Sequence, residues 1–283
     1  MKKTNIIKIG DVRIGGGNPV AIQSMTNTDT RCIDATCAQI NALEEAGCEI
    51  IRVAVPDMTA ALSISEIKKR INIPLVADVH FDYRLALAAI ENGCEKLRIN
   101  PGNIGDASRV KLISDAAKAR GIPIRVGVNA GSLEKDIYRK HGGVTAEGLV
   151  ESALGQVKSL EEHGFFDIVI AVKTHSVPVN IRAYKLLSEQ TDYPLHIGIT
   201  EAGGVYSGSI RSAVGIGALL AAGISSTNDD ARRGYYKQVL EIIQQEVPYV
   251  HCFNRSGLFG AAKDLNMTIH TGGIYYFNDI TRN

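Results

Sequence analysis

The sequence lacks both a long apolar segment and an excess of charge of one sign. No run within its 283 residues reaches the roughly 18 apolar residues that a membrane-spanning helix requires, and none follows the N-terminal MKKTNIIKIGD as a signal sequence would. With 31 basic and 30 acidic residues the formal net charge is +1, which gives no indication of a nucleic-acid-binding surface. We therefore expect a soluble, cytoplasmic protein without a membrane or nucleic-acid partner.

Cysteine is scarce and scattered along the chain. The five cysteines are Cys32, Cys37, Cys48, Cys94 and Cys252, and no two of them form a C-x-x-C pair. This spacing argues against a zinc site, a redox dithiol or a set of cluster ligands. We expect no metal site among them and interpret the thiols as buried or inert.

Short apolar runs alternate with longer amphipathic stretches over most of the sequence. Strands are predicted at residues 20–25, 50–55, 74–79, 95–100, 122–128, 167–172 and 195–200. Helices are predicted between and after them, at residues 33–46, 59–70, 83–92, 106–120, 146–163, 179–190 and 209–222. The strands are apolar almost throughout, which is typical of parallel strands buried on both faces.

Glycine follows four of these helices, in the segments EEAGCEI, IENGCEK, KARGIPI and EEHGFFD. A left-handed glycine can end a helix just before the chain enters a buried parallel strand. The pattern therefore favours an α/β fold, a TIM-type (β/α)8 barrel, with an open doubly wound sheet as the alternative.

Polar residues stand at the ends of the predicted strands, which is where βα barrels place their active sites. Residues two apart on a strand point to the same side, so Asp78 with His80, and Arg98 with Asn100, are expected to face the barrel mouth together. The candidates are Gln23, Ser24, Arg52, Asp78, His80, Arg98, Asn100, Arg125, Asn129, Lys173, His196, Thr200 and Glu201.

Three arginines and a lysine in this set, Arg52, Arg98, Arg125 and Lys173, predict a positive pocket in a nearly neutral protein. Arginine offers paired donors to phosphate oxygens, so a phosphate or diphosphate substrate is favoured. The simpler alternative for each single cation is a salt bridge at the rim. Asp78 could likewise cap the next helix, although Asp82 is better placed for that role.

Several longer motifs, in order, closely resemble the N-terminal barrel of the 4-hydroxy-3-methylbut-2-enyl diphosphate synthase family of isoprenoid biosynthesis. They are VAIQSMTNTDT, IIRVAVPD, LVADVHFDYRLAL, KLRINPGNIG, IRVGVNAGSLEKD, ESAL and YPLHIGITEAG. The resemblance implies an oxidoreductase of the methylerythritol phosphate pathway that opens the ring of 2-C-methyl-D-erythritol 2,4-cyclodiphosphate. It also implies electrons from ferredoxin or flavodoxin, carried by a [4Fe-4S] cluster, and we expect a homodimer.

The same resemblance implies roles for individual residues. The substrate-binding set would be Arg52, Asp78, His80, Arg98, Asn100, Arg125, Asn129 and Lys173. Glu201, in GITEAG, would be the catalytic acidic residue near the reacting oxygen.

Residues 1–224 match the family's barrel, and residues 225–283 are a divergent tail. SSTNDDARRGYYKQ takes the place of the family's eighth strand, whereas residues 237–247 keep the pattern of the eighth helix. The family's following domain opens with C-P-T-C and carries the cluster cysteines, but here Cys252 stands alone in VHCFNRSGLFGAAKDLN. We therefore expect a barrel incomplete at strand eight, with the cluster's cysteine ligands absent from this chain.

Three functions remain open at this point. The chain is a synthase, in a truncated or altered form; or it is a barrel that binds the cyclic diphosphate without turnover, because it has no electron source. The third is a pterin-binding transferase resembling dihydropteroate synthase, which uses a similar barrel and a diphosphate substrate. Iron content separates the first two, and ligand preference separates the third.

Overall fold

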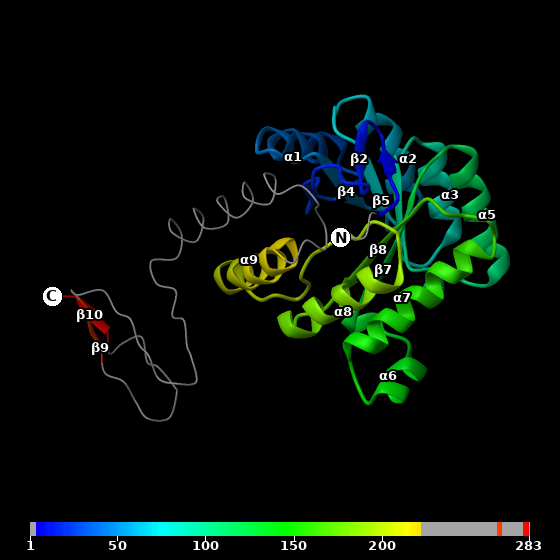
Figure 1. The fold of residues 1–283 in the computed structure, drawn as a ribbon. Helices are drawn as coiled ribbons and strands as arrows, with labels where there is room; N and C mark the ends of the chain where they lie inside the picture. Colours follow the sequence, from blue (N-terminus) through cyan, green and yellow to red (C-terminus); the bar gives the residue numbers. More distant parts are fainter. Residues whose placement is uncertain (1–3, 222–264, 268–279, 283) are drawn as a thin grey trace. The chain divides into compact units, whose positions relative to one another are not determined.

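The computed structural model describes residues 4–221, 265–267 and 280–282. Six parallel strands form one sheet in sequential order, from β3 to β8 (Figure 1). They are β3 (Gln23–Met25), β4 (Ile50–Ala54), β5 (Leu75–Asp78), β6 (Lys96–Ile99), β7 (Ile124–Asn129) and β8 (Ile168–Lys173). The chain divides into two units, Met1–Val239 and Leu240–Asn283. In the second unit, β9 (Leu265–Met267) and β10 (Ile280–Arg282) pair antiparallel.

Helices follow the strands in the alternating order that the sequence predicts. They are α1 (Ile33–Glu45), α2 (Met58–Lys68), α3 (Tyr83–Glu91), α4 (Pro101–Ile104), α5 (Ala107–Ala119), α6 (Lys135–His141), α7 (Ala146–Glu161), α8 (Val177–Gln190) and α9 (Val205–Ala221), with a 3₁₀ turn at Ala130–Ser132. Outward-facing strand residues such as Ile51 and Leu97 share one buried cluster with helix residues such as Ile64 and Leu149. Among helices in the described ranges, none combines the length and apolar character needed to cross a membrane.

The sheet curves strongly around its inner face. Lys96 on β6 donates a hydrogen bond to the Oε1 atom of Gln23 on β3 at 2.7 Å. Three strand spacings separate β3 from β6, so the two strands would lie about 14 Å apart in a flat sheet. Val169 on β8 also packs with residues of β4 and β5 in one apolar cluster. This curvature confirms the α/β TIM-barrel-like fold over the six strands that are described.

A hairpin covers the amino-terminal end of the barrel interior. Strands β1 (Ile7–Ile9) and β2 (Val12–Ile14) pair antiparallel, and Ile7 and Ile9 are buried against Ile50, the first residue of β4. The sequence analysis did not predict this hairpin, because three-residue strands are too short to show a period. An apolar layer at the amino-terminal end leaves the carboxyl end of the strands as the polar end of the interior.

Local signals at the helix ends are confirmed. The four glycines expected to end helices, Gly47, Gly93, Gly121 and Gly164, all have positive φ, between 62° and 94°. At the other end of α3, the Asp82 carboxylate accepts a hydrogen bond from the backbone N–H of Arg84 and caps the helix. Asp78 therefore does not cap α3, which was the simplest structural role expected for it.

The prediction of a seventh strand at residues 195–200 is wrong. Only Leu195 forms a β-bridge, with Ile170 of β8. Beyond it, the Tyr184 hydroxyl donates to the carbonyl of His196, and the Asn180 side chain donates to the carbonyl of Gly198. Side chains of α8 therefore bond carbonyls in this segment that a regular ladder would use. The expected eighth helix, and the position where strand eight was sought, lie outside the described residues.

Candidate active site

A buried carboxylate lies at the centre of the inner face. Asp78, at the end of β5, is 4% exposed, and its Oδ1 accepts a hydrogen bond from Arg98 Nη1 at 3.0 Å. Its Oδ2 lies 3.7 Å from Arg52 Nε and 3.4 Å from His80 Nε2. Burial alone would raise the pKa of Asp78, but the charges of Arg98 and Arg52 outweigh it and lower the pKa. The carboxylate is therefore ionised and holds these side chains together.

Arg125 has no such partner, although it is buried more deeply. It is 2% exposed, and its Nε and Nη1 atoms have no hydrogen-bond partner among the described residues. Burial, and then repulsion from Arg52 and Arg98, lower the pKa of Arg125 to about 9. Unsatisfied, buried donors on a cation cost free energy, which a bound anion would recover.

Lys173, at the end of β8, completes the positive lining. Burial, together with the charges of Arg125, Arg52 and Arg98, lowers the pKa of Lys173 to about 7. Its Nζ lies 3.4 Å from Nε2 of His196. Positive charge thus accumulates inside the barrel well beyond what the Asp78 carboxylate neutralises.

The remaining predicted residues lie around this cluster in different roles. The side chain of Asn100 accepts a hydrogen bond from the backbone N–H of Gly102 and caps α4. Asn129 ends β7, directly beside Lys173 in the sheet register. Glu201 is exposed and has a φ of +52°, a conformation that is strained for a residue other than glycine. Its Oε1 lies 3.4 Å from the position that a Cβ atom on Gly131 would take, next to the loop after β7.

Two residues of the interior were missed by the sequence analysis. Lys96 is two positions before Arg98, so the alternation that placed Arg98 inside also places Lys96 there. Gly127 lies beside Arg98: a Cβ atom at this position would come within 2.8 Å of Arg98 Nε. An isolated glycine within a strand commonly marks such a close approach, and that signal in IRVGVN was available.

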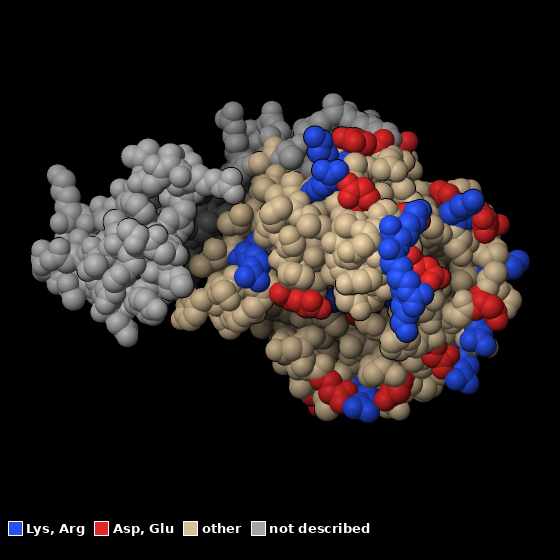
Figure 2. Space-filling model, turned by 90° about the horizontal axis from the view of Figure 1, so that it is seen from below, with Lys and Arg blue, Asp and Glu red and all other residues tan. Residues whose placement is uncertain are grey.

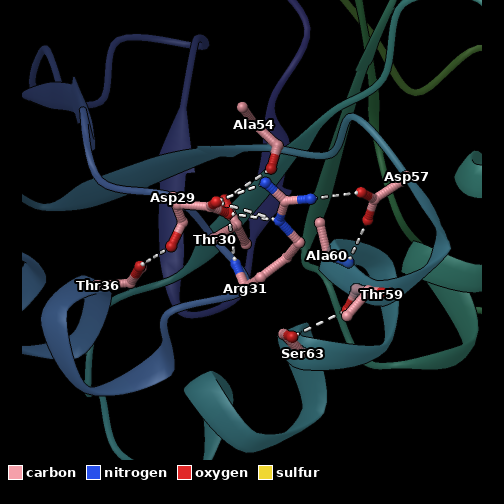
Figure 3. Close-up of polar contacts among 9 residues, drawn as sticks. All are labelled: Asp29, Thr30, Arg31, Thr36, Ala54, Asp57, Thr59, Ala60 and Ser63. Atoms are coloured by element: carbon pink, nitrogen blue, oxygen red, sulfur yellow. Dashed lines mark hydrogen bonds and ion pairs between the residues drawn. The ribbon is translucent and has the colours of Figure 1, made fainter.

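The loops after β3 and β4 are joined by a separate polar network (Figure 3). The Thr30 hydroxyl donates to the carbonyl of Ala54 at 2.6 Å. Arg31 pairs with Asp29 at 2.6 Å and with Asp57 at 3.1 Å, and Asp57 also caps α2. The exposed Arg31 is thus neutralised by two carboxylates, in contrast to the buried arginines of the interior.

The face of the molecule shown in Figure 2 does not share the charge imbalance of the interior. On the face shown in Figure 2, basic and acidic side chains are interspersed, and many of them lie towards the edge. With a formal net charge of only +1, the positive charge relevant to binding is local and enclosed. A compact, multiply charged anion fits this arrangement better than an extended polyanion.

Gly127→Ala is expected to destabilise the protein by about 1–3 kcal/mol, because the new methyl group would displace the Arg98 guanidinium in a packed interior. Anion binding should weaken as well. Gly155→Ala in α7 is the matched control, since nothing lies within 4 Å of the added atom, and helix propensity predicts a gain of about 0.5–1 kcal/mol. Urea denaturation measures both effects. Equal behaviour of the two variants would contradict the close approach.

Binding of anions is expected to weaken as pH rises above about 7. Since the pKa of Lys173 is about 7 in the free protein, the ammonium that an anion prefers is present below this pH and is lost above it. The affinity for sulfate should fall by up to about tenfold per pH unit from this group. Because the pKa of an unfolded lysine is higher, at 10.5, the unfolded chain binds more protons between these values, and the unfolding free energy should rise with pH there. Calorimetry with sulfate from pH 6 to 9 measures the affinity. An affinity that does not change with pH would show that Lys173 does not lose its proton near pH 7 in the anion site.

The four described cysteines are all free thiols. Cys37, Cys48 and Cys94 are buried and Cys32 is exposed, and burial raises the pKa of Cys94 to about 12, which keeps it a thiol. No group of three His, Cys, Asp or Glu side chains within the described ranges could hold a metal ion. These four cysteines therefore do not fit an iron–sulfur cluster, and Cys252 lies outside the described residues.

Comparison with known families decides the relationship. Residues 4–228 match the family model described as the GcpE TIM-barrel domain, which is most of the 283-residue chain. The chain belongs to the GcpE family. The resemblance seen in the sequence motifs is thereby confirmed.

Relatives of this GcpE chain carry one common name. A 4-hydroxy-3-methylbut-2-en-1-yl diphosphate synthase (flavodoxin) from Caldanaerobacter subterraneus subsp. tengcongensis is 64% identical over 226 residues, which cover 80% of this chain and 64% of the relative. The protein of that name from Ruminiclostridium cellulolyticum is 60% identical over 225 residues, with the same coverage. The GcpE chain thus spans just under two thirds of the length of these relatives.

Solved structures show the fold of this GcpE chain at much lower identity. Dihydropteroate synthase from Xanthomonas albilineans is similar with a TM-score of 0.56 and 13% identity, covering 87% of this chain and 100% of that one. The 3-dehydroquinate dehydratase from Geobacillus kaustophilus gives a TM-score of 0.55 and 15% identity, with the same coverage. At these identities the likeness concerns the barrel alone.

Proposed function

We propose that the interior of this barrel binds 2-C-methyl-D-erythritol 2,4-cyclodiphosphate, and that the protein takes part in the reductive ring opening that yields 4-hydroxy-3-methylbut-2-enyl diphosphate. The observation that carries the proposal is the buried excess of positive charge, above all Arg125, whose Nε and Nη1 atoms have no hydrogen-bond partner among the described residues. A diphosphate supplies two negative charges and several acceptor oxygens in a small volume. It therefore satisfies these donors with charge-assisted hydrogen bonds.

The side chains divide into those that bind the diphosphate and those that position them. Arg52, Arg98, Arg125 and Lys173 would donate to phosphate oxygens, because each presents N–H groups inside the barrel. Asp78 would orient Arg98 through the 3.0 Å hydrogen bond already present. Arg98 and Arg52 both contact the Asp78 carboxylate before the ligand binds. Side chains held in place in this way lose little conformational freedom on binding.

The other predicted residues have proposed roles at the mouth. His80 is half-exposed beside Asp78 and would contact the part of the ligand nearest to solvent, and Asn129 would do the same from β7. Asn100 would act mainly by holding the start of α4. Glu201 is proposed to exchange a proton with the oxygen lost as water, since it is an exposed carboxylate on the loop beside Gly131.

The electrons for the ring opening would come from flavodoxin, as the names of the relatives indicate, or from ferredoxin. A [4Fe-4S] cluster would supply electron transfer in an enzyme of this family, but the four described cysteines do not fit one. We retain the prediction that this chain alone binds no cluster, and also the prediction of a homodimer.

Calorimetry with the cyclic diphosphate tests the proposal. Lys173→Met is expected to weaken binding by about 1.5–3 kcal/mol, the scale of a hydrogen bond to a charged group. Arg31→Met is the matched control, because Arg31 is exposed and already paired with two carboxylates, and it should bind like the wild type. If pterin diphosphate binds and the cyclic diphosphate does not, the transferase alternative replaces this proposal.

Glu201→Gln separates binding from chemistry. It should leave affinity for the cyclic diphosphate within about threefold, since Glu201 donates nothing to the anion, but it should abolish proton transfer and slow turnover by about 10²–10⁴-fold. Turnover is measured in whichever preparation, this chain or a longer form, shows it with reduced flavodoxin. Unchanged turnover would remove Glu201 from the mechanism, and binding without turnover in the wild-type chain would favour the binding-module alternative.

A further inference from the structure

We infer that Lys96, which lies deeper in the barrel than the strand-end cations, is a further residue of the anion site and takes up a proton when the anion binds. The inference rests on the proposed function in one respect, because it takes the anion to be the cyclic diphosphate. Lys96 is the first residue of β6, two positions before Arg98 on the same inner face. It was not among the residues expected from sequence or from family resemblance.

Lys96 is enclosed, and no carboxylate of the described residues forms an ion pair with it. Its side chain is 1% exposed, and its Nζ donates at 2.7 Å to the Oε1 atom of Gln23 across the interior. A neutral amide accepts one hydrogen bond but offers no opposite charge. An enclosed ammonium group of this kind is costly in free energy, and losing the proton removes that cost.

The groups around Lys96 make the charge more costly still. Arg125 on β7, Arg52 on β4 and Lys173 on β8 all raise the positive potential at its amine, and His196 faces the same cations. Arg98, on the same strand as Lys96, donates a hydrogen bond to Asp78 on β5. The Asp78 carboxylate therefore compensates Arg98 and not Lys96. From the hairpin side the interior is closed by apolar residues of the cluster around Ile9. Burial, and then these cations, lower the pKa of Lys96 well below its ordinary value.

A diphosphate reverses the sign of this environment. Its two negative charges lie among Arg52, Arg125 and Lys173 in the proposed complex, so the potential at Lys96 becomes favourable to an ammonium group. A cyclic diphosphate has one acidic proton per phosphorus, and both are lost well below neutral pH. The ligand therefore neither brings nor accepts a proton, and the amine of Lys96 takes one H⁺ from the buffer to become an ammonium.

Calorimetric titration at pH 8 in HEPES and in Tris counts the protons, because the difference in observed enthalpy follows the ionisation enthalpies of the buffers. The full chain should take up about two protons per cyclic diphosphate, on Lys96 and Lys173. Lys96→Met, which keeps the length of an unbranched side chain, should take up about one fewer. Lys118→Met, on the exposed face of α5, is the matched control and should behave like the wild type. An unchanged proton count in Lys96→Met overturns the inference.

Sulfate, which is fully ionised at this pH, is the second probe and separates this inference from the proposed function. If sulfate binds with proton uptake that Lys96→Met reduces, while the cyclic diphosphate does not bind, the proton-coupled site stands and the proposed function fails. If Lys96→Met does not fold, ¹³C NMR of the wild-type protein tests the same inference. At pH 8, ¹³C NMR should show two lysine Cε resonances in the neutral form that move to the ammonium form on addition of anion. A single such resonance, belonging to Lys173, overturns the inference.

Discussion

Arg125→Met is expected to stabilise the protein without ligand while it weakens binding of the cyclic diphosphate. The guanidinium is 2% exposed, with Nε and Nη1 unpartnered among the described residues. Replacing an unpaired buried cation with an apolar side chain of similar length should raise the unfolding free energy by about 1–4 kcal/mol. The same change removes donors from the anion site, so affinity should fall by about 1.5–3 kcal/mol. Thermal denaturation and calorimetry measure the two effects.

The opposite signs are what make Arg125→Met informative. Arg84→Met is its control, because Arg84 is exposed and paired with Asp82, and neither stability nor affinity should change by more than about 0.5 kcal/mol. If Arg125→Met lowers stability in the absence of ligand, the guanidinium already has a stabilising partner within the protein and is not an unsatisfied donor available to an anion.

Asp78→Asn is expected to lower the unfolding free energy by about 3–5 kcal/mol. The amide keeps the shape of the side chain but removes the charge that compensates Arg98 and Arg52, and it leaves those cations buried and unpaired. Saturating sulfate should recover part of the loss, because an anion that binds the native state stabilises it by mass action. Urea denaturation with and without sulfate gives both numbers.

Asp106→Asn provides the comparison for Asp78→Asn. Asp106 is an exposed helix cap whose contact with Arg109 is 3.8 Å long, so the cost should be below about 1 kcal/mol. Similar losses for the two variants would show that Asp78 is not the charge centre of the interior. Failure of sulfate to restore Asp78→Asn would show that the cations do not form a common anion site.

The sequence predicted those parts of the fold that rest on local, repeated signals. Apolar runs of strand length indicate burial on both faces of a sheet, and glycines such as Gly47 and Gly93 allow the positive φ that ends a helix. Both signals recur along the chain. It failed at residues 195–200, where the apolar pattern suits a strand but Tyr184 and Asn180 bond the carbonyls from α8. The hydrophobic pattern within residues 195–200 contains no information about hydrogen bonds from side chains of another helix.

For the site, the sequence indicated which polar residues lie on the strands, but it placed Arg52 and Arg125 at strand ends, whereas Arg52 is in the middle of β4 and Arg125 is the second residue of β7. It did not indicate how their charges are balanced. Arg31 and Arg125 are both arginines of the same predicted barrel, yet Arg31 is paired with two carboxylates, whereas Nε and Nη1 of Arg125 have no hydrogen-bond partner in the described part of the chain. That difference depends on which loops meet, as with Asp29 and Asp57. Lys96 could have been found by alternation with Arg98, but its enclosure follows only from the curvature that brings Gln23 across the interior.

The attachment of residues 196–198 to α8 has a consequence for motion near Glu201. Beyond Leu195 the carbonyls of this segment are bonded to Tyr184 and Asn180 of one helix, while the backbone N–H of His196 donates to the carbonyl of Ile170 on β8 at 2.8 Å. Opening of the segment would break this bond to β8 but not the ladder between β7 and β8. Local opening of this kind has its own free energy, separate from global unfolding. Glu201, with its left-handed backbone, lies just after this hinge-like stretch. A helix on the outside of the barrel thus holds, through the Tyr184 and Asn180 side chains, the segment that leads to the Glu201 carboxylate.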